Sequence, residues 1–386
     1  MKRSPVPHVR DNWQAKLEEV GFHFYEMEGR PYWDESAFYE LTSDEVDRLE
    51  AVTDELYGMC LELVDRVVRE SLYERLAIPP RFWRYVERSW EQREPSIYGR
   101  FDLWYDGRSD PKLLEFNADT PTALFEASIV QYYWLQDYAP REDQFNSIHE
   151  KLLDVLQSGI RRAVGQNVLY FSCVKETLED LTTTEYLRDL AIQAGIETNH
   201  IYIDEVGWDL ASRQFVDLEN RPINYMFKLY PWEWIITESF ADQLLTSTLS
   251  LFEPAWKMIL SNKAILPLLW EMYPNHPNLL PSFFEPPNTE KTYVEKPFFS
   301  REGENVRTGT WFMRKGKRVI YQEYRELPNF GGNYPAIGSW IIGDHAAGIG
   351  IREDTTPITN NLSRFMPHLF RTDDSDRSPG SSTVPV

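Results

Sequence analysis

The sequence has few cysteines and lacks the short motifs that mark several common catalytic centres. Its two cysteines, Cys60 and Cys173, stand in no metal-binding or redox spacing, and so few in a chain of 386 residues are typical of a reducing compartment. The chain contains no HExxH, CxxC or GxGxxG motif and no recognisable Ser/His/Asp or Cys/His arrangement. These absences argue against zinc chemistry, a dinucleotide-binding fold and a catalytic triad.

Long apolar runs and positive net charge are also absent. A membrane-spanning helix needs about 18 consecutive apolar residues, and the sequence has no such stretch, nor an apolar segment after its basic start. The formal net charge of −21 argues against nucleic acid and anionic membranes as partners, because both are polyanions. It favours a cationic small-molecule substrate, although an acidic surface more often simply keeps a protein soluble. We expect a cytoplasmic protein.

The composition predicts an ordered globular chain with a large core, since 42% of the residues are hydrophobic and 14% are aromatic. Apolar residues at helical spacing predict a long helix over 43–72, capped by Thr42 or Ser43, and a second helix over 80–92. A strand, a helix and a second strand between 167 and 204 predict a βαβ unit with a parallel sheet. Strands and turns between 291 and 354 predict an antiparallel, lid-like region.

The expected fold class is therefore α+β or α/β, in five regions. These are a mainly helical N-terminal region with a β-hairpin (1–165), the βαβ unit (166–260), the lid (261–340), a return to the core (341–370) and a disordered tail (371–386).

The stretch around which the chain is organised is the hairpin, with strands at 97–105 and 112–118 joined by the turn residues at 106–111. Successive side chains of a strand point to opposite faces. The alternation predicts an apolar face of Phe101, Leu103, Leu114 and Phe116 and a polar face of Arg100, Asp102, Glu115 and Asn117.

The polar face is a candidate metal and phosphate site. A turn centred between residues 108 and 109 places Asp102 opposite Glu115 and Arg100 opposite Asn117. Facing carboxylates repel unless a positive group lies between them, and two carboxylates with an amide carbonyl suit Mg²⁺. On the hairpin alone an alternative stays open, in which this is the solvated face of an amphipathic hairpin whose acids are neutralised by Arg100 and Lys112.

Three polar residues outside the hairpin are candidate substrate contacts. Thr120 and Thr122 stand where the chain enters a helix predicted over 122–138, and helix entry points bind anions through their N–H groups. Threonines before a helix are more often simple caps. Glu185, near the start of the βαβ helix, is either a substrate contact or, more commonly, a first-turn partner of the helix dipole.

Five segments in one order carry a resemblance to a known family: YGRFD followed by LLEFNADTPTALFEAS, SNKAILPLLW, YVEKPFFSREGENV, YQEY and GIGIRED. The combination resembles the synthetase domain of the glutathionylspermidine synthase family, whose members are ATP-grasp ligases. The resemblance covers most of the chain, from the hairpin or earlier to about Phe365. It implies an ATP-grasp-like fold in which 166–260 binds substrate and 261–340 closes over ATP.

Carried over by position, the resemblance implies Mg²⁺ and ATP as cofactors and assigns a role to each matching residue. Asp102, Glu115 and Asn117 would hold Mg²⁺, while Arg100 and Arg352 would face the phosphoryl group. ATP would be contacted by Lys263, Lys296, Gly303 in the flap 300–306, and Gln322, Glu323 and Tyr324 beside the adenine. Thr120 and Thr122 would contact a peptide substrate. Lys263 and Lys296 can also be read as ordinary surface residues, and Arg352 as a partner of Glu353 or Asp354.

The implied reaction joins a carboxylate to an amine through an acyl phosphate, so no enzyme nucleophile is required. Two departures limit the comparison. Bifunctional family members carry an additional amidase domain with a cysteine nucleophile, for which this chain has neither room nor motif, and the family has serines where Thr120 and Thr122 stand. Glutathione and spermidine are thus suggested by the family alone. The rival interpretations are a non-catalytic nucleotide-binding or regulatory protein of the same fold and an acidic module that binds polyamines or basic peptides. The oligomeric state is not predicted.

Overall fold

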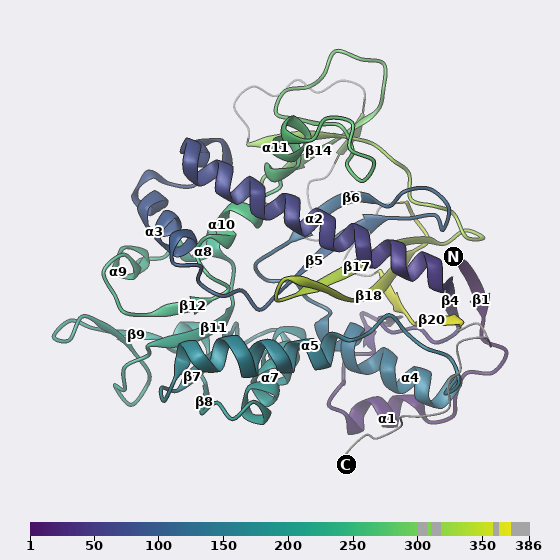
Figure 1. Ribbon diagram of the computed structural model, residues 1–386. Coiled ribbons are helices and arrows are strands. Elements are labelled where there is room, and N and C mark those ends of the chain that lie inside the picture. The colour runs from purple at the N-terminus through teal and green to yellow at the C-terminus, as the bar shows by residue number, and fades with distance from the viewer. Residues whose placement is uncertain (300–306, 310–317, 358–362, 372–386) are drawn as a thin grey trace.

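The molecule is built around a five-stranded antiparallel sheet (Figure 1). The computed structural model describes residues 1–299, 307–309, 318–357 and 363–371. In spatial order the sheet contains β19 (Arg364–Met366), β18 (His345–Asp354), β17 (Tyr334–Ile342), β5 (Tyr98–Trp104) and β6 (Lys112–Asn117). The predicted hairpin, β5 with β6, lies at one edge of this sheet. The strands β17, β18 and β19, from the C-terminal part of the chain, continue the sheet from β5.

One face of the central sheet is covered by the long helix α2 (Ser43–Glu70), as Figure 1 shows. Thr42 caps it in a capping box, in which its hydroxyl accepts from the Glu45 N–H at 3.2 Å and Glu45 accepts from the Thr42 N–H at 2.8 Å. The predicted helix and its Thr42 cap are confirmed. The short helices α4 (Gln131–Tyr138) and α5 (Ile148–Val155) lie on the opposite face.

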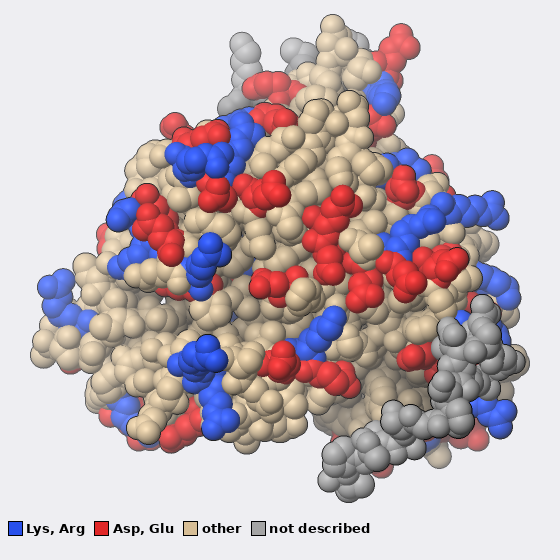
Figure 2. All heavy atoms as spheres, in the orientation of Figure 1, with Lys and Arg blue, Asp and Glu red and all other residues tan. Residues whose placement is uncertain are grey.

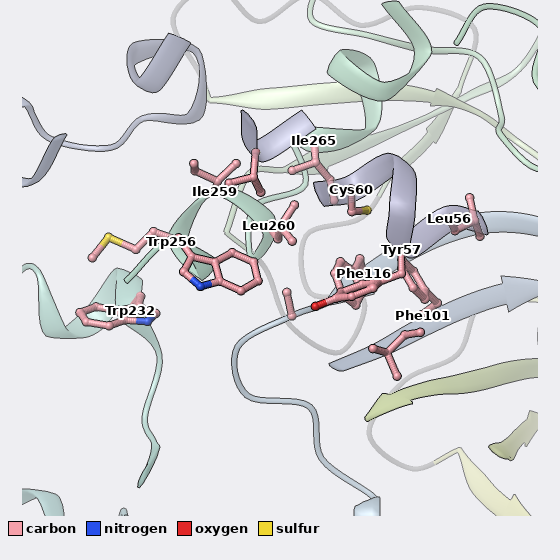
Figure 3. Packing of buried hydrophobic residues seen from close by; sticks show 14 of the residues in the cluster. Leu56, Tyr57, Cys60, Phe101, Phe116, Trp232, Trp256, Ile259, Leu260 and Ile265 are labelled. Carbon is pink, nitrogen blue, oxygen red and sulfur yellow. The ribbon is translucent and has the colours of Figure 1, made fainter. Parts of the chain in front are cut away.

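Packing between α2 and the hairpin forms a large part of the core (Figure 3). Phe101 of β5 and Phe116 of β6 stack at 4.0 Å between ring centroids, beneath Tyr57 and Cys60 of α2. All four side chains are buried. Burying an aromatic side chain of this size contributes about 2 to 3 kcal/mol, so this layer holds the hairpin firmly from behind.

A four-stranded parallel sheet forms a second layer beside the central sheet. Its order is β12 (Ser250–Phe252), β11 (Tyr225–Leu229), β7 (Leu169–Cys173) and β8 (Thr198–His200). The helix α7 (Leu178–Gln193) connects β7 to β8, which pair in parallel. The predicted parallel βαβ unit is confirmed, although β8 ends at His200 and the following residues turn into a short 3₁₀ helix, Ile203–Glu205.

A small antiparallel sheet forms the region expected to be the lid. Its order is β13 (Ser282–Phe283), β16 (Val319–Glu323), β14 (Tyr293–Pro297) and β15 (Arg307–Gly309). The helix α11 (Ile265–Met272) precedes it, as the sequence predicts, and lies with β14 at the top of Figure 1. The expected lid boundary at 340 falls inside β17, which pairs with β5 of the central sheet. The lid sheet itself therefore ends at Glu323.

The two ends of the described chain meet in a third sheet, of order β1 (Lys2–Pro5), β4 (Ala37–Thr42) and β20 (His368–Arg371). The expectation of a mainly helical N-terminal region missed β1 and β4. A buried carboxylate ties these ends together: Glu353 accepts from Arg3 Nε at 2.6 Å and from Arg364 Nη2 at 2.8 Å. Glu353 is fully buried, and removing either arginine would leave part of its charge uncompensated.

The remaining elements connect these layers. The helices are α1 (Trp13–Glu19), α3 (Pro80–Glu91), α6 (Arg161–Val164), α8 (Trp232–Ile235), α9 (Ala241–Leu244) and α10 (Lys257–Leu260), with a 3₁₀ helix at Leu72–Leu76 and π-helical turns at Glu126–Val130 and Leu156–Ile160. Two short ribbons pair β2 (Glu26–Met27) with β3 (Arg30–Pro31) and β9 (Gly207–Asp209) with β10 (Gln214–Val216). The mixed α/β class is confirmed.

Acidic side chains gather over the outer face of α2 (Figure 2). The exposed acids of this helix are Asp44, Asp47, Glu55, Glu62, Asp65 and Glu70. Part of the net charge of −21 therefore lies on the solvent side of an amphipathic helix, turned away from the central sheet. Within the described residues, no helix is long and apolar enough to cross a membrane.

Candidate active site

A pocket lies where the polar face of the hairpin meets the lid sheet, the start of α11 and the loop that follows β6. The pocket-lining residues that the sequence predicts are Arg100, Asp102, Glu115, Asn117, Thr120, Thr122, Lys263, Lys296, Gln322, Glu323, Tyr324 and Arg352. These residues come from segments more than 200 positions apart in the chain. The structure therefore brings together every predicted site residue that it describes except Glu185.

The hairpin register agrees with the prediction at the site and departs from it next to the turn. Arg100 is paired with Asn117 and Asp102 with Glu115, as expected. A β-bulge then follows Asp102, so Leu103 pairs with Leu113. Leu113 is buried and Leu114 is half-buried at the pocket. The prediction that Leu114 belongs to the apolar face is wrong, because the bulge exchanges the faces of these two leucines.

Arg100 is held at the pocket floor by several contacts. Its Nε donates to Asp102 Oδ1 at 2.8 Å and its Nη1 donates to the Thr122 carbonyl at 2.5 Å. The guanidinium lies 5.7 Å from the Trp340 ring centroid. Gly338 leaves room for the side chain, since a Cβ there would come within 2.9 Å of Arg100 Cδ. Arg100 is thus fixed by an acid on its own strand, an aromatic ring on β17 and the loop after β6.

Glu115 is paired with a cation from the other side of the pocket. Lys263, at the entry to α11, places its Nζ 3.2 Å from Glu115 Oε2, and both side chains are largely buried. The alternative in which Lys112 neutralises the hairpin acids is wrong, because Lys112 donates instead to the Pro277 carbonyl. The two facing carboxylates therefore have separate cationic partners, Arg100 and Lys263, which offset the repulsion expected from the sequence.

Lys296 is buried within the lid sheet and points at the hairpin. Its Nζ donates to Gln322 Oε1 at 2.7 Å and to the Leu114 carbonyl at 2.9 Å. The pKa of Lys296 is lowered to about 8, chiefly by burial and also by the positive charge of Lys263, although Glu115 and Asp102 oppose the shift. Lys296 is 9% exposed, so reading it as an ordinary surface lysine is wrong.

Gln322, Glu323 and Tyr324 line the pocket at the end of β16. Gln322 is buried and its Nε2 donates to the Leu113 carbonyl at 3.0 Å, which joins the lid sheet to the hairpin. The main-chain N–H of Glu323 donates to Pro281 and that of Tyr324 to Thr292. These two N–H groups are therefore already bonded within the protein, so a main-chain contact with adenine would have to use other main-chain groups of this segment.

Arg352 reaches the pocket from β18, the strand next to β17. Its guanidinium lies 5.1 Å from the Phe365 ring centroid, and its neighbour Glu353 bonds Arg3 and Arg364 on the other face of the strand. The alternative in which Arg352 pairs with Glu353 is therefore wrong, because Glu353 is buried and bonds other arginines.

Two predicted residues lie outside this group. Glu185 sits in the middle of α7, where it bonds Arg188 at 2.6 Å, and it does not line the pocket. It is not a first-turn acid either, since Glu179 and Asp180 occupy that turn. Gly303 and the rest of the flap 300–306 lie outside the described residues.

The structure also shows pocket residues that the sequence did not single out. Asp119 and Glu233 line the pocket, from the loop after β6 and from α8. In the sequence, Asp119 lies within the motif LLEFNADTPTALFEAS and Glu233 lies between two tryptophans, and neither acid has a spacing that marks a site. Only long-range contacts bring them to the pocket.

Two neighbouring acids, the buried Glu126 and the half-buried Glu179, lie near Arg352 but do not line the pocket. The Tyr32 hydroxyl donates to Glu126 Oε1 at 2.6 Å and lies 3.2 Å from Glu179 Oε1. The pKa of Glu126 is raised to about 8, chiefly by burial and also by the charge of Glu179, although the hydrogen bond from Tyr32 and the charge of Arg352 oppose the shift. A cation placed here would favour the ionised carboxylates.

The residues predicted to hold Mg²⁺ fit such an ion in their donor chemistry. Asp102, Glu115 and Asn117 present carboxylate and amide groups on one face of two paired strands, in register. Among the described residues, no group of three or more His, Cys, Asp or Glu could hold a metal ion. The predicted set has only two carboxylates, which suits Mg²⁺ because this ion keeps water and phosphate oxygens as its other ligands.

Comparison with protein families gives a match over almost the whole chain. A family model described as glutathionylspermidine synthase preATP-grasp matches residues 5–371. A relative from Haemophilus influenzae, whose assignment as an acid–amine ligase is itself provisional, is 40% identical over 96% of this chain and 100% of its own length.

More distant relatives are longer proteins. The bifunctional glutathionylspermidine synthetase/amidase of Escherichia coli is 28% identical over 86% of this chain and 58% of its own length. The trypanothione synthetase of Crithidia fasciculata is 28% identical over 91% of this chain and 57% of its own. The chain thus spans somewhat more than half the length of these two relatives.

Among solved structures, a glutathione synthetase-like effector from Globodera pallida in its apo form has a similar fold. The TM-score is 0.57 at 11% sequence identity, over 86% of this chain and 89% of that one. The likeness concerns the fold alone.

Proposed function

Because the chain belongs to the glutathionylspermidine synthase preATP-grasp family, we propose that it uses ATP and Mg²⁺ to join a carboxylate to an amine through an acyl phosphate. The family prediction made from the five motifs is confirmed. Relatives named as acid–amine ligase, glutathionylspermidine synthetase and trypanothione synthetase identify the chain as an amide-bond-forming ligase that joins a carboxylate and an amine. The nucleotide, the metal and the intermediate are our proposals.

The observation that carries the proposal is the meeting of four cations with the polar face of the hairpin. Arg100, Lys263, Lys296 and Arg352 line the same pocket as the carboxylates of Asp102 and Glu115 and the amide of Asn117. Phosphoryl transfer requires positioned groups that neutralise charge and no enzyme nucleophile. Asp102, Glu115 and Asn117 would hold Mg²⁺, which supplies charge neutralisation to the phosphates of ATP when bound.

In the first step a carboxylate oxygen of the substrate bonds to the γ-phosphorus of ATP, and the bond from that phosphorus to ADP breaks. Lys263 and Lys296 stand at the lid side of the pocket to neutralise the phosphates, and Arg100 and Arg352 stand at its floor to orient the transferred group. In the second step the amine nitrogen bonds to the acyl carbon, phosphate leaves, and the nitrogen loses a proton.

Thr120, Thr122 and Glu233 suggest where the two organic substrates lie. Thr120 and Thr122 face the pocket beside Arg100 and suit a polar carboxylate substrate. Glu233 lines the same pocket, and its carboxylate suits a cationic amine. A polyamine and a small peptide such as glutathione meet these requirements.

The test is ADP release by the purified protein with Mg-ATP, across a panel of peptides paired with polyamines and other amines. We expect release that needs both a carboxylate and an amine, and an amide product of matching mass. Mg-ATP binding without release for any pair would favour the non-catalytic interpretation. If Mg-ATP also fails to raise Tm, the acidic binding module is favoured, because a ligand that binds only the native state must stabilise it.

A further inference from the structure

The loop between β6 and the π-helical turn is held in place by a buried ion pair. Lys228 Nζ lies 2.5 Å from Asp119 Oδ1, and the two residues are 0% and 2% exposed. Lys228 belongs to β11, in the middle of the parallel sheet, whereas Asp119 follows β6 of the central sheet. The pair therefore joins two layers of the molecule at the wall of the pocket, which Asp119 lines.

Both carboxylate oxygens of Asp119 are engaged by the same short segment. While Oδ1 meets Lys228, Oδ2 accepts from the Trp232 N–H at 2.8 Å, at the first residue of α8. Lys228 Nζ also donates to the Tyr230 carbonyl at 3.1 Å and lies 4.7 Å from the Trp232 ring centroid. Residues 228–232 thus wrap around one carboxylate.

This attachment fixes two walls of the pocket relative to each other. One wall is the loop 118–123, which carries Thr120 and Thr122 and whose Thr122 carbonyl accepts from Arg100. The other is α8, whose Glu233 lines the pocket one residue after Trp232. Asp119 lies at the junction, so the distance between the threonines and Glu233 depends on its contacts.

The energetics favour a geometric role over a purely stabilising one. Burying two charges carries a large desolvation cost, and apolar residues of similar volume often stabilise a protein as well as a buried ion pair. Unlike apolar residues, an ion pair fixes which two groups meet and in which direction they point. Here it fixes the direction of the loop 118–123, which enters the pocket.

We propose that Asp119 and Lys228 form a positioning pair that sets the carboxylate-substrate site by holding the loop 118–123 against α8. The inference rests on the proposed function. Neither side chain is a catalytic residue, since both act through Thr120, Thr122 and Glu233. The pair should therefore control the affinity for the carboxylate substrate and leave Mg-ATP binding, on the lid side, unchanged.

The experiment compares Asp119→Asn and Lys228→Met with a matched control, Glu35→Gln. Asparagine keeps an acceptor for the Trp232 N–H and removes only the ion pair, so it serves as the conservative variant if methionine at 228 disrupts folding. Glu35 forms another buried ion pair, with Arg10 at 2.7 Å, away from the pocket. Three quantities are measured: amide hydrogen exchange over 118–123, the Tm shift with Mg-ATP, and KM and kcat of ADP release with glutathione and spermidine.

We expect faster exchange over 118–123 and a KM for glutathione raised about tenfold or more in both variants, because small misplacements of a substrate cost large factors. The Tm shift with Mg-ATP should match the wild type, Lys228→Arg should recover part of the KM, and the double variant should be no worse than either single one. Exchange and KM equal to those of Glu35→Gln would overturn the positioning role. Absence of ADP release by the wild type would count against the proposed substrates alone, because hydrogen exchange still decides whether the pair holds the loop.

Discussion

The two faces of the β5–β6 hairpin belong to the same two strands, but one carries apolar side chains and the other carries charged ones. The face toward α2 contains Phe101, Leu103 and Phe116, each 5% exposed or less. The face toward the pocket contains charged residues, of which Arg100 bonds Asp102 and Glu115 pairs with Lys263. The comparison shows how a strand can place charged groups accurately, because the apolar face fixes the backbone from which they project.

The largest expected effect lies on the apolar face. Phe101→Ala removes a fully buried ring that stacks on Phe116 at 4.0 Å, and we expect a loss of about 4 kcal/mol in the free energy of unfolding. Urea unfolding measures it. The control is Leu210→Ala, which truncates a side chain that is 84% exposed and should change the free energy of unfolding little. A loss below about 1 kcal/mol for Phe101→Ala would show that this layer does not anchor the hairpin.

On the polar face the effect should fall on activity. Asp102→Asn or Glu115→Gln should lower kcat/KM for Mg-ATP-dependent ADP release by about 100-fold or more, since each removes a group proposed to hold Mg²⁺. Both variants should stay folded, since the Asp102 and Glu115 side chains are 30% and 22% exposed in their ion pairs.

The control for these variants is Asp65→Asn, which removes one acid of a surface ion pair with Arg69 on α2. It should keep full activity. Unfolding of Asp102→Asn and Glu115→Gln, or full activity in both, contradicts the metal assignment.

The bulge predicts that two neighbouring leucines respond differently. Leu113→Ala should cost about 3 kcal/mol in the free energy of unfolding, because Leu113 is fully buried, and Leu114→Ala about 1 kcal/mol. The difference of about 2 kcal/mol, measured by urea unfolding, tests which leucine faces the core. The reverse order would mean that the regular alternation continues and that the bulge after Asp102 does not form.

The smallest effect concerns protonation of Lys296. Burial lowers its pKa to about 8, and the phosphates of bound ATP should raise it again because they favour the charged ammonium. Mg-ATP binding above pH 8 should therefore take up protons, and its affinity should fall by up to about tenfold per pH unit.

Calorimetry in two buffers of different ionisation enthalpy measures this uptake. Lys296→Arg is the control, since arginine stays charged throughout this range and should show no uptake at this position. Equal binding enthalpies in both buffers for the wild type would exclude Lys296 as an ATP contact that titrates near pH 8.

Much of the site could be predicted because its residues stand in local patterns. The alternation around Asp102 and Glu115 sets their common face, and the turn residues between the strands set their register. Thr42 could be identified as a cap because capping depends on residues three positions apart. The family motifs added Lys263 and Lys296, whose roles no local pattern indicates.

The predictions from the sequence are wrong where a residue has several possible partners. Lys112 is near Glu115 in the chain but bonds Pro277, while the distant Lys263 pairs with Glu115. Glu185 is predicted as a substrate contact because the sequence places it near a helix start. The helix begins earlier, at Leu178, and Glu185 bonds Arg188 instead. In both cases proximity along the chain was a poor guide to contact in space.

By itself, then, the sequence determined the hairpin, its polar face, the long capped helix and the family. Periodicity, turns and caps act over a few residues, and the motifs are matched in order along the chain. Only the tertiary structure decided that Leu114 turns to the pocket, that β4 and β20 join the two ends, and that Asp119 meets Lys228 in the parallel sheet. These features depend on which distant segments close on one another, and that choice is made by the packing of whole layers.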